Sequence, residues 1–142
     1  MNAGAIASKN VICIKPSASI LDAAKLMAQR NIGFLIVSSD CKRDLAGVIS
    51  ERDIIRAIAS GIQPSEPVDN IMTRKVVYVY KDTPVWEIAR LMRKYNIRHI
   101  LVMDNGQIFG VISIRDLLKE SDVIERLVEY AEERIDEISA HD

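Results

Sequence analysis

The chain has 142 residues, of which 49% are apolar and 27% are charged, and its formal net charge is −1. This balance excludes a disordered chain, and it gives no overall field that would draw the protein to nucleic acid or to a membrane surface. No run of about 18 successive apolar residues is present, and the first residues, MNAGAIAS, lack the positive charge and apolar core of a signal peptide. We therefore expect a protein without a membrane-spanning helix.

The cysteines and histidines are few and scattered. Cys13 and Cys41 form no CxxC pair, so we expect both thiols to be free in a reduced, cytoplasmic setting. His99 and His141 are the only histidines, and no group of residues has the spacing of metal ligands. The sequence predicts neither a metal site nor a cofactor.

The first half of the chain predicts the order β-α-β-β-α. A β-branched run, VICI at 11–14, indicates a strand, and the following helix has Ser19 as its predicted N-cap. Two apolar strands follow at 34–37 and 46–49. Another helix is expected directly after Ser50, because Asp53 three residues later completes a capping-box pattern.

The second half repeats this order. VVYVY at 76–80 predicts a strand, and Thr83 before Pro84 predicts an N-cap with proline at the first helical position. Strands at 100–102 and 108–112 are joined by Asn105-Gly106, a favoured pair for a two-residue hairpin. A last helix follows Ser113, with Asp116 three residues on, so that GVISERD at 47–53 returns as GVISIRD at 110–116.

The repeat sets the predicted domain boundaries. We expect a first repeat at 1–60, a linker at 61–67, a second repeat at 68–120 and a C-terminal helix at 121–142. In that tail, apolar residues fall at helical spacing, at Ile124, Leu127, Val128, Ala131, Ile135 and Ile138. The helix must be covered either by its own module or by a second chain, and the sequence leaves both open. Trp86, the only tryptophan, is expected to pack rather than to stack on a ligand.

The motif GVIS-x-RD has two interpretations. In the structural one, Ser50 and Ser113 are helix N-caps, and Asp53 and Asp116 are acids of the first turn that favour the helix dipole. In the functional one, the same carboxylate accepts hydrogen bonds from a ribose diol, as an acidic residue does in dinucleotide-binding folds, while serine, backbone N–H and arginine groups suit phosphate.

The two halves resemble CBS repeats, and together they resemble a Bateman module. The residues that carry the resemblance are LMAQRNIGFLIV with GVISERD, LMRKYNIRHILV with GVISIRD, and VDNIMTRKVVYVY at the start of the second repeat. The resemblance implies an α/β (α+β) fold of tandem β-α-β-β-α repeats related by a pseudo-twofold axis. It also implies a homodimer, and clefts that bind adenosine nucleotides.

In such modules each cleft combines the Ser-x-x-Asp segment of one repeat with the first strand and the mid-repeat turn of the other. Carried onto this sequence, cleft one contains Ser50, Arg52, Asp53, Val77, Arg98 and His99. Cleft two contains Ile12, Gly33, Phe34, Ser113, Arg115 and Asp116. Arg98 is expected near the axis, within reach of either cleft. Glu51 would oppose a phosphate if it pointed inward, whereas Ile114 would not, so cleft two is expected to bind better unless Glu51 faces solvent.

These features predict a non-catalytic regulatory module that binds AMP, or next ADP or ATP, and signals to an unidentified effector protein through a conformational or dimer change. S-adenosylmethionine or NAD could replace AMP, because both carry a ribose diol. An enzyme is not expected, since no activated nucleophile, metal cluster or phosphate loop is present. The remaining alternative is a structural or interaction adaptor with empty clefts. Local basic patches could associate such an adaptor with nucleic acid, although the charge balance speaks against it.

Overall fold

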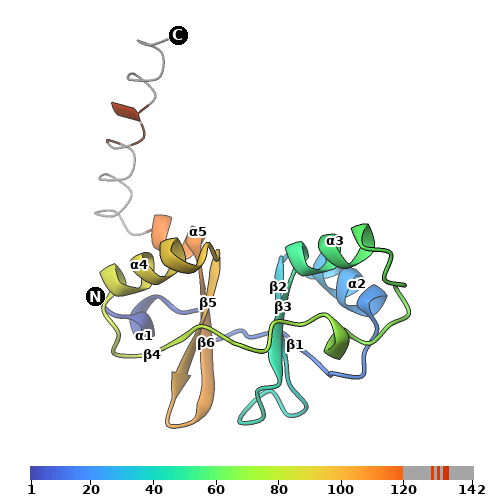
Figure 1. Ribbon diagram of the computed structural model, residues 1–142. Helices are drawn as coiled ribbons and strands as arrows, with labels where there is room; N and C mark the ends of the chain where they lie inside the picture. Colours follow the sequence, from blue (N-terminus) through green and yellow to red (C-terminus); the bar gives the residue numbers. More distant parts are fainter. Residues whose placement is uncertain (120–128, 130, 132, 135–142) are drawn as a thin grey trace.

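Two three-stranded sheets form the centre of the molecule, and helices lie toward its outer sides (Figure 1). The computed structural model describes residues 1–119, 129, 131, 133 and 134. The first sheet contains β1 (Cys13–Ile14), β2 (Phe34–Val37) and β3 (Gly47–Ser50), and the second contains β4 (Tyr78–Tyr80), β5 (His99–Asp104) and β6 (Gln107–Ser113). The helices are α1 (Ala3–Ile6), α2 (Ile20–Arg30), α3 (Glu51–Ala59), the 3-10 turn η1 (Val68–Asn70), α4 (Val85–Tyr95) and α5 (Ile114–Leu118).

The α/β class and the two matching sheets are as the sequence predicted. In each sheet the first strand pairs in parallel with the second, and the second pairs antiparallel with the third. No helix in the described part of the chain has the length and apolarity needed to cross a bilayer. The amphipathic helix predicted at 121–142 falls almost entirely outside the described residues. Whether it packs on its own module or on a second chain therefore stays open.

Short local signals account for most element boundaries. Ser19 caps α2 as predicted, because its hydroxyl accepts a hydrogen bond from the backbone N–H of Asp22 at 3.0 Å. The predicted hairpin at Asn105-Gly106 is also confirmed, since φ is 51° and 74° at these two residues. Asn105 and Gly106 alone form the loop between β5 and β6, because Asp104 already pairs with Gln107.

The predicted cap of the second repeat's first helix is wrong. Helix α4 begins at Val85, and Pro84, not Thr83, occupies the N-cap position with extended backbone angles. The Thr83 hydroxyl instead accepts a hydrogen bond from the Tyr80 N–H at 3.1 Å and so holds the preceding turn. The first N–H group of the helix donates to the carbonyl of Met1 at 3.2 Å, and backbone from the chain's start therefore takes the place of a side-chain cap.

Each half has its own apolar core behind its sheet. Because strand side chains alternate, Leu35 and Val37 point into the first core, while Ile100 and Val102 point into the second. Helix residues complete the two cores, among them Met27 and Met92 at matched positions of α2 and α4. Ile36 and Leu101, on the opposite faces of the sheets, are also fully buried. Apolar packing therefore lies on both faces of the two central strands.

The two halves exchange short segments of backbone. Ala3, from the start of the chain, is buried in the core of the second half, and Ser8 pairs with Val111 of β6 through hydrogen bonds of 2.9 and 3.0 Å. Conversely, Val68 is buried in the core of the first half, and Thr73 pairs with Val48 of β3 at 2.8 and 3.0 Å. Each half therefore contains backbone from both repeats.

Two glycines permit this exchange. A Cβ atom at Gly47 would lie 2.6 Å from the Thr73 carbonyl oxygen, and one at Gly110 would lie 2.6 Å from the Ser8 carbonyl oxygen. Such distances are shorter than any van der Waals contact, so only glycine lets the crossing segments come this close.

A disulfide joins Cys13 to Cys41, which corrects the prediction of two free thiols. The bond ties β1 to the long turn between β2 and β3, where the Asp40 carboxylate accepts hydrogen bonds from three successive backbone N–H groups. These bonds, led by the one from Lys42, hold the pKa of Asp40 below its ordinary value. The carbonyl of Lys42 also accepts a 2.7 Å hydrogen bond from Ile108 of β6, so this turn contacts the second half.

Candidate functional site

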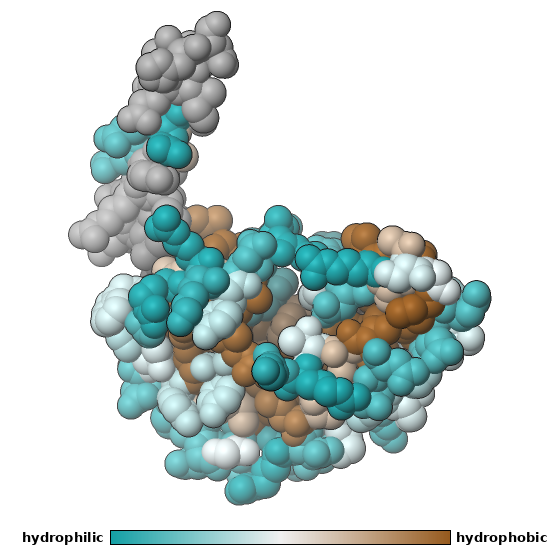
Figure 2. Space-filling view, viewed as in Figure 1, coloured by the Kyte–Doolittle hydropathy of each residue, from teal (hydrophilic) through white to brown (hydrophobic). Residues whose placement is uncertain are grey.

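Two cavities of about 370 Å³ each lie where residues of the two repeats meet. Cleft one is lined from the first repeat mainly by the start of α3 and from the second by residues 73–77 and 95–99. Cleft two is lined by the start of α5 and by residues 8–12 and 31–34. Figure 2 shows a hollow between the two halves, with apolar residues inside it and hydrophilic residues around it.

All twelve predicted site residues line the cavity to which the sequence analysis assigned them. Cleft one brings together Ser50, Arg52, Asp53, Val77, Arg98 and His99. Cleft two brings together Ile12, Gly33, Phe34, Ser113, Arg115 and Asp116. Their position beside a cavity is a structural finding, whereas their role in binding stays a prediction.

The serine and aspartate of each motif form a complete capping box. The Ser50 hydroxyl accepts a hydrogen bond from the Asp53 N–H at 3.3 Å, and Asp53 Oδ2 accepts the Ser50 N–H at 2.9 Å. Ser113 and Asp116 repeat the arrangement at 3.2 and 2.7 Å. The interpretation of both serine–aspartate pairs as helix N-terminal caps is therefore confirmed.

The cap leaves part of each carboxylate unused. Oδ2 of Asp53 and Oδ2 of Asp116 serve the caps, and within the described residues the Oδ1 atoms accept no hydrogen bond. A carboxylate has about four acceptor sites, so one that faces a cavity can hold its cap and still accept from a ligand hydroxyl. The two interpretations of the motif are thus compatible with each other.

The two cavities share a wall. Phe34 and His99, at matched positions of the two repeats, stack with their ring centroids 4.9 Å apart, and both line both cavities. Gly33, Glu51 and Arg98 also line both. The expectation that Arg98 is within reach of either cleft agrees with this arrangement. A ligand in one cavity would therefore contact rings, Phe34 and His99, that also line the other cavity.

The surroundings of His99 lower the pKa of its imidazole and so favour the neutral form. Burial is the main cause that lowers its pKa below the ordinary value, with Arg98 and Arg115 contributing in the same direction. The carboxylates of Glu51 and Asp116 oppose this effect. A neutral stacked imidazole suits a wall residue, and it offers one donor and one acceptor nitrogen at the boundary between the cavities.

Glu51 does not distinguish the two clefts in the way that the sequence suggested. Its side chain is exposed, yet it lines both cavities, and its carboxylate lies over Gly33, where an added Cβ would come within 3.0 Å of the Glu51 Cδ atom. The pairing follows from the backbone, since the Glu51 N–H donates to the Gly33 carbonyl at 3.0 Å. The predicted preference for cleft two therefore loses its basis.

Several lining residues were not among the predicted ones. Cleft one also contains Thr73, Lys75, Tyr95, Asn96 and Arg56, and cleft two also contains Ser8, Asn10 and Asn31. The internal repeat could have found most of them, because an offset of 65 residues pairs 8 with 73, 10 with 75 and 31 with 96. Residues 8–10 and 73–75 were missed because the strand patterns begin only after them, at residues 11 and 76.

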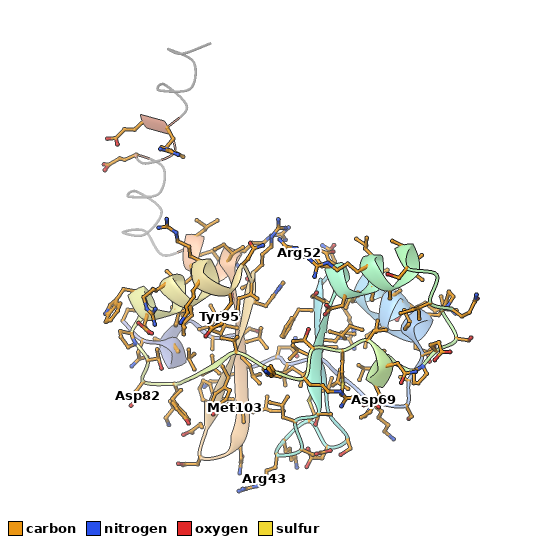
Figure 3. All side chains as sticks on the ribbon, viewed as in Figure 1. Arg43, Arg52, Asp69, Asp82, Tyr95 and Met103 are labelled. Atoms are coloured by element: carbon orange, nitrogen blue, oxygen red, sulfur yellow. A yellow bond between two sulfur atoms is a disulfide. The ribbon has the colours of Figure 1, made fainter. Side chains whose placement is uncertain are left out.

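Arg52 bridges the two halves at the rim of cleft one. Its Nη1 atom donates a 3.2 Å hydrogen bond to the carbonyl of Asn96, which is the C-cap of α4. Figure 3 shows Arg52 at the gap between the halves. Asn96 and its counterpart Asn31 both adopt left-handed backbone angles, so each turns the chain sharply from a helix toward the shared wall.

Comparison with known proteins agrees with this architecture. A family model described as CBS domain matches residues 3–60 and 68–129. A structure of a CBS domain protein from Pyrobaculum aerophilum complexed with AMP is 29% identical, with a TM-score of 0.80 over 91% of this chain and 99% of that one. The CBS domain pair of protein MJ0100, in complex with 5′-methylthioadenosine and S-adenosyl-L-methionine, is 31% identical, with a TM-score of 0.74 over 92% and 98%.

Among curated proteins, an uncharacterised 17.7 kDa protein of Acidianus ambivalens is 38% identical over 115 residues, which are 80% of this chain and 69% of that protein. The chain spans less than two thirds of most of the other leading relatives, for example 21% of the L-aspartate semialdehyde sulfurtransferase of Methanocaldococcus jannaschii. The region that matches this chain is thus one part of that longer protein. Since the family model covers both repeats and the fold is shared with solved CBS pairs, the chain belongs to the CBS domain family.

Proposed function

We propose that the protein is a non-catalytic regulatory module that binds an adenosine nucleotide, AMP first, in the cavities between its two repeats. The observation that carries the proposal is the unused oxygen of Asp53 and of Asp116, which each line a cavity while their other oxygen serves a helix cap. A ribose diol offers two adjacent hydroxyl donors, and a carboxylate is the acceptor that matches them.

The rest of each cavity suits the other parts of a nucleotide. Val77 in cleft one and Ile12 in cleft two are partly buried apolar residues that can pack on a purine. Arg52 and Arg115 supply forked donors for phosphate. The P. aerophilum relative, complexed with AMP, supports this choice of ligand.

A ligand in such a cavity would touch both repeats, and its binding free energy would therefore depend on how they are arranged. In cleft one the carboxylate of Asp53 comes from the first repeat, whereas Val77 and Arg98 come from the second. A ligand shifts a conformational equilibrium only by its differential affinity for the two states. Contacts divided between the two repeats provide such a difference, which an effector protein could detect.

The proposal is tested by thermal-shift and calorimetric titrations with AMP, ADP, ATP, NAD and S-adenosylmethionine. A ligand present at about 100 times its dissociation constant should raise the free energy of unfolding by roughly 2.7 kcal/mol. We expect AMP to do so. If no adenosine compound changes the unfolding temperature, the motif serves only as a helix cap, and the protein is better described as an adaptor with empty clefts.

S-adenosylmethionine is a second candidate ligand, because the Glu51 carboxylate lines both cavities and would attract a sulfonium cation rather than a phosphate. The related CBS pair in complex with S-adenosyl-L-methionine supports this alternative. The same titrations separate the two candidates. Binding of S-adenosylmethionine that is tighter than binding of AMP would favour the second.

A homodimer is the proposed assembly, because large apolar side chains are exposed on the outer helices. Trp86 on α4 is 68% exposed, which contradicts its predicted packing within the protein, and Ile55 on α3 is 65% exposed. Both would be covered by a second copy of the chain. Light scattering at micromolar concentration should give the mass of a dimer for the protein and for Trp86→Phe, and a smaller mass for Trp86→Glu. A monomeric mass for the unmodified protein would refute the assembly.

A further inference from the structure

The two cavities are built from matched positions, which makes their few differences informative. Thr73 matches Ser8, Val48 matches Val111, and the whole Ser-x-Arg-Asp segment of one cavity matches that of the other. The residues that line both cavities cannot distinguish them. The difference must therefore lie in positions that line one cavity and have a different counterpart in the other.

Lys75 is the clearest of these positions. It lines cleft one, and its counterpart 65 residues earlier, Asn10, lines cleft two. Both side chains are exposed, so the exchange replaces a solvent-exposed cation by a neutral amide at the matched position. In the described part of the chain Lys75 has no ion pair, whereas its neighbour Arg74 is paired with Asp69 at 3.1 Å. The charge of Lys75 is thus available to a ligand.

The balance of charge around the cavities differs in the same direction. Cleft one is lined by four cations, Arg52, Arg56, Lys75 and Arg98, against two carboxylates, Glu51 and Asp53. Cleft two is lined by two cations, Arg98 and Arg115, against two carboxylates, Glu51 and Asp116. Lys119, the counterpart of Arg56, does not line cleft two. Cleft one alone therefore has cations in excess.

We infer that the two cavities take different members of one ligand class. Cleft one takes a nucleoside di- or triphosphate, whose terminal phosphates lie against Lys75 and Arg56. Cleft two takes a nucleoside with one phosphate or none, because its cations only balance its carboxylates. The inference rests on the proposed function, since it assumes that both cavities hold a nucleoside. Its physical cause is the excess of uncompensated donors, which lowers the free energy of each further phosphate.

Reciprocal substitutions at the matched position test the inference. Calorimetry would measure ATP and AMP binding, without added divalent metal, to the full chain and to Lys75→Asn, Asn10→Lys and Lys42→Asn. We expect Lys75→Asn to weaken ATP about tenfold, the loss of one charge-assisted contact, and to change AMP less than threefold. Asn10→Lys should strengthen ATP binding at a second site by a similar factor. Lys42 lies in the β2–β3 turn outside both cavities. Lys42→Asn changes the net charge by as much as Lys75→Asn does, and it should neither weaken nor strengthen ATP binding.

The outcomes separate the two proposals. Equal effects of Lys75→Asn on ATP and AMP, or no effect on ATP, would overturn the assignment of polyphosphate to cleft one and leave the proposed function standing. The same holds if Lys42→Asn weakens ATP as much as Lys75→Asn does, because the effect is then one of net charge. A wild-type chain that binds neither ATP nor AMP overturns both proposals.

Discussion

Replacing Asp53 or Asp116 with asparagine should weaken nucleotide binding at the corresponding cavity about 100-fold. Each carboxylate has one oxygen in a helix cap and one that accepts no hydrogen bond within the described residues. A ribose diol would make two charge-assisted hydrogen bonds to it, and loss of the charge costs about 3 kcal/mol in total. Asparagine keeps an oxygen acceptor for the backbone N–H of the cap, so the fold should be retained. Calorimetry with both AMP and ATP measures the affinity at the two cavities, and thermal denaturation measures the stability.

The chain contains its own control for this experiment. Ser19 and Asp22 at the start of α2 form a third capping box of the same composition, and Asp22 lines neither cavity. Asp22→Asn should therefore lower the unfolding temperature slightly and leave affinity unchanged. If all three variants lose similar stability and none loses affinity, the aspartates act as caps alone, and the proposed site is wrong.

Removing the disulfide should lower the free energy of unfolding by about 3 kcal/mol, because it relaxes the constraint on the unfolded chain. The bond closes a loop with a sequence separation of 28 residues. For a chain of this size, the double variant Cys13→Ser/Cys41→Ser should melt roughly 10 °C below the oxidised protein. Thermal denaturation with and without reductant measures the difference.

The same variant provides the control for reduction. Dithiothreitol should lower the melting temperature of the wild type toward that of the double variant, and it should leave the double variant unchanged. Thiol titration of the denatured, unreduced protein should find no free cysteine. Two free thiols per chain, with a melting temperature that does not respond to reductant, would show that the pair is not bonded in solution.

The features that depend on short segments of the chain were predicted correctly from the sequence. The hairpin at Asn105-Gly106, the N-cap at Ser19 and the capping boxes at Ser50 and Ser113 are each encoded in a few neighbouring residues, and they follow from local backbone preferences. The cap at Thr83 failed because its competitor is not local. The N–H of Val85 donates to the carbonyl of Met1, which no pattern near residue 83 could reveal.

The composition of the cavities needed more than periodicity. The assignment of residues from opposite repeats to one cleft came from the family resemblance, because spacing alone does not say which segments meet. Even so, the sharing of Glu51 by both cavities was missed, since it depends on how closely the repeats approach the axis. The disulfide was missed because Cys13 and Cys41 are distant in sequence and meet only when β1 pairs beside β2.

The exchange of backbone between the halves means that the sequence repeat is not the folding unit. If only the second repeat were present, its core would lack Ala3. If only the first repeat were present, its core would lack Val68. Neither repeat can therefore complete its core alone, and the two must unfold together in one cooperative transition. A nucleotide bound in either cavity would then protect the whole pair against unfolding and proteolysis, including the sheet that is farther from it.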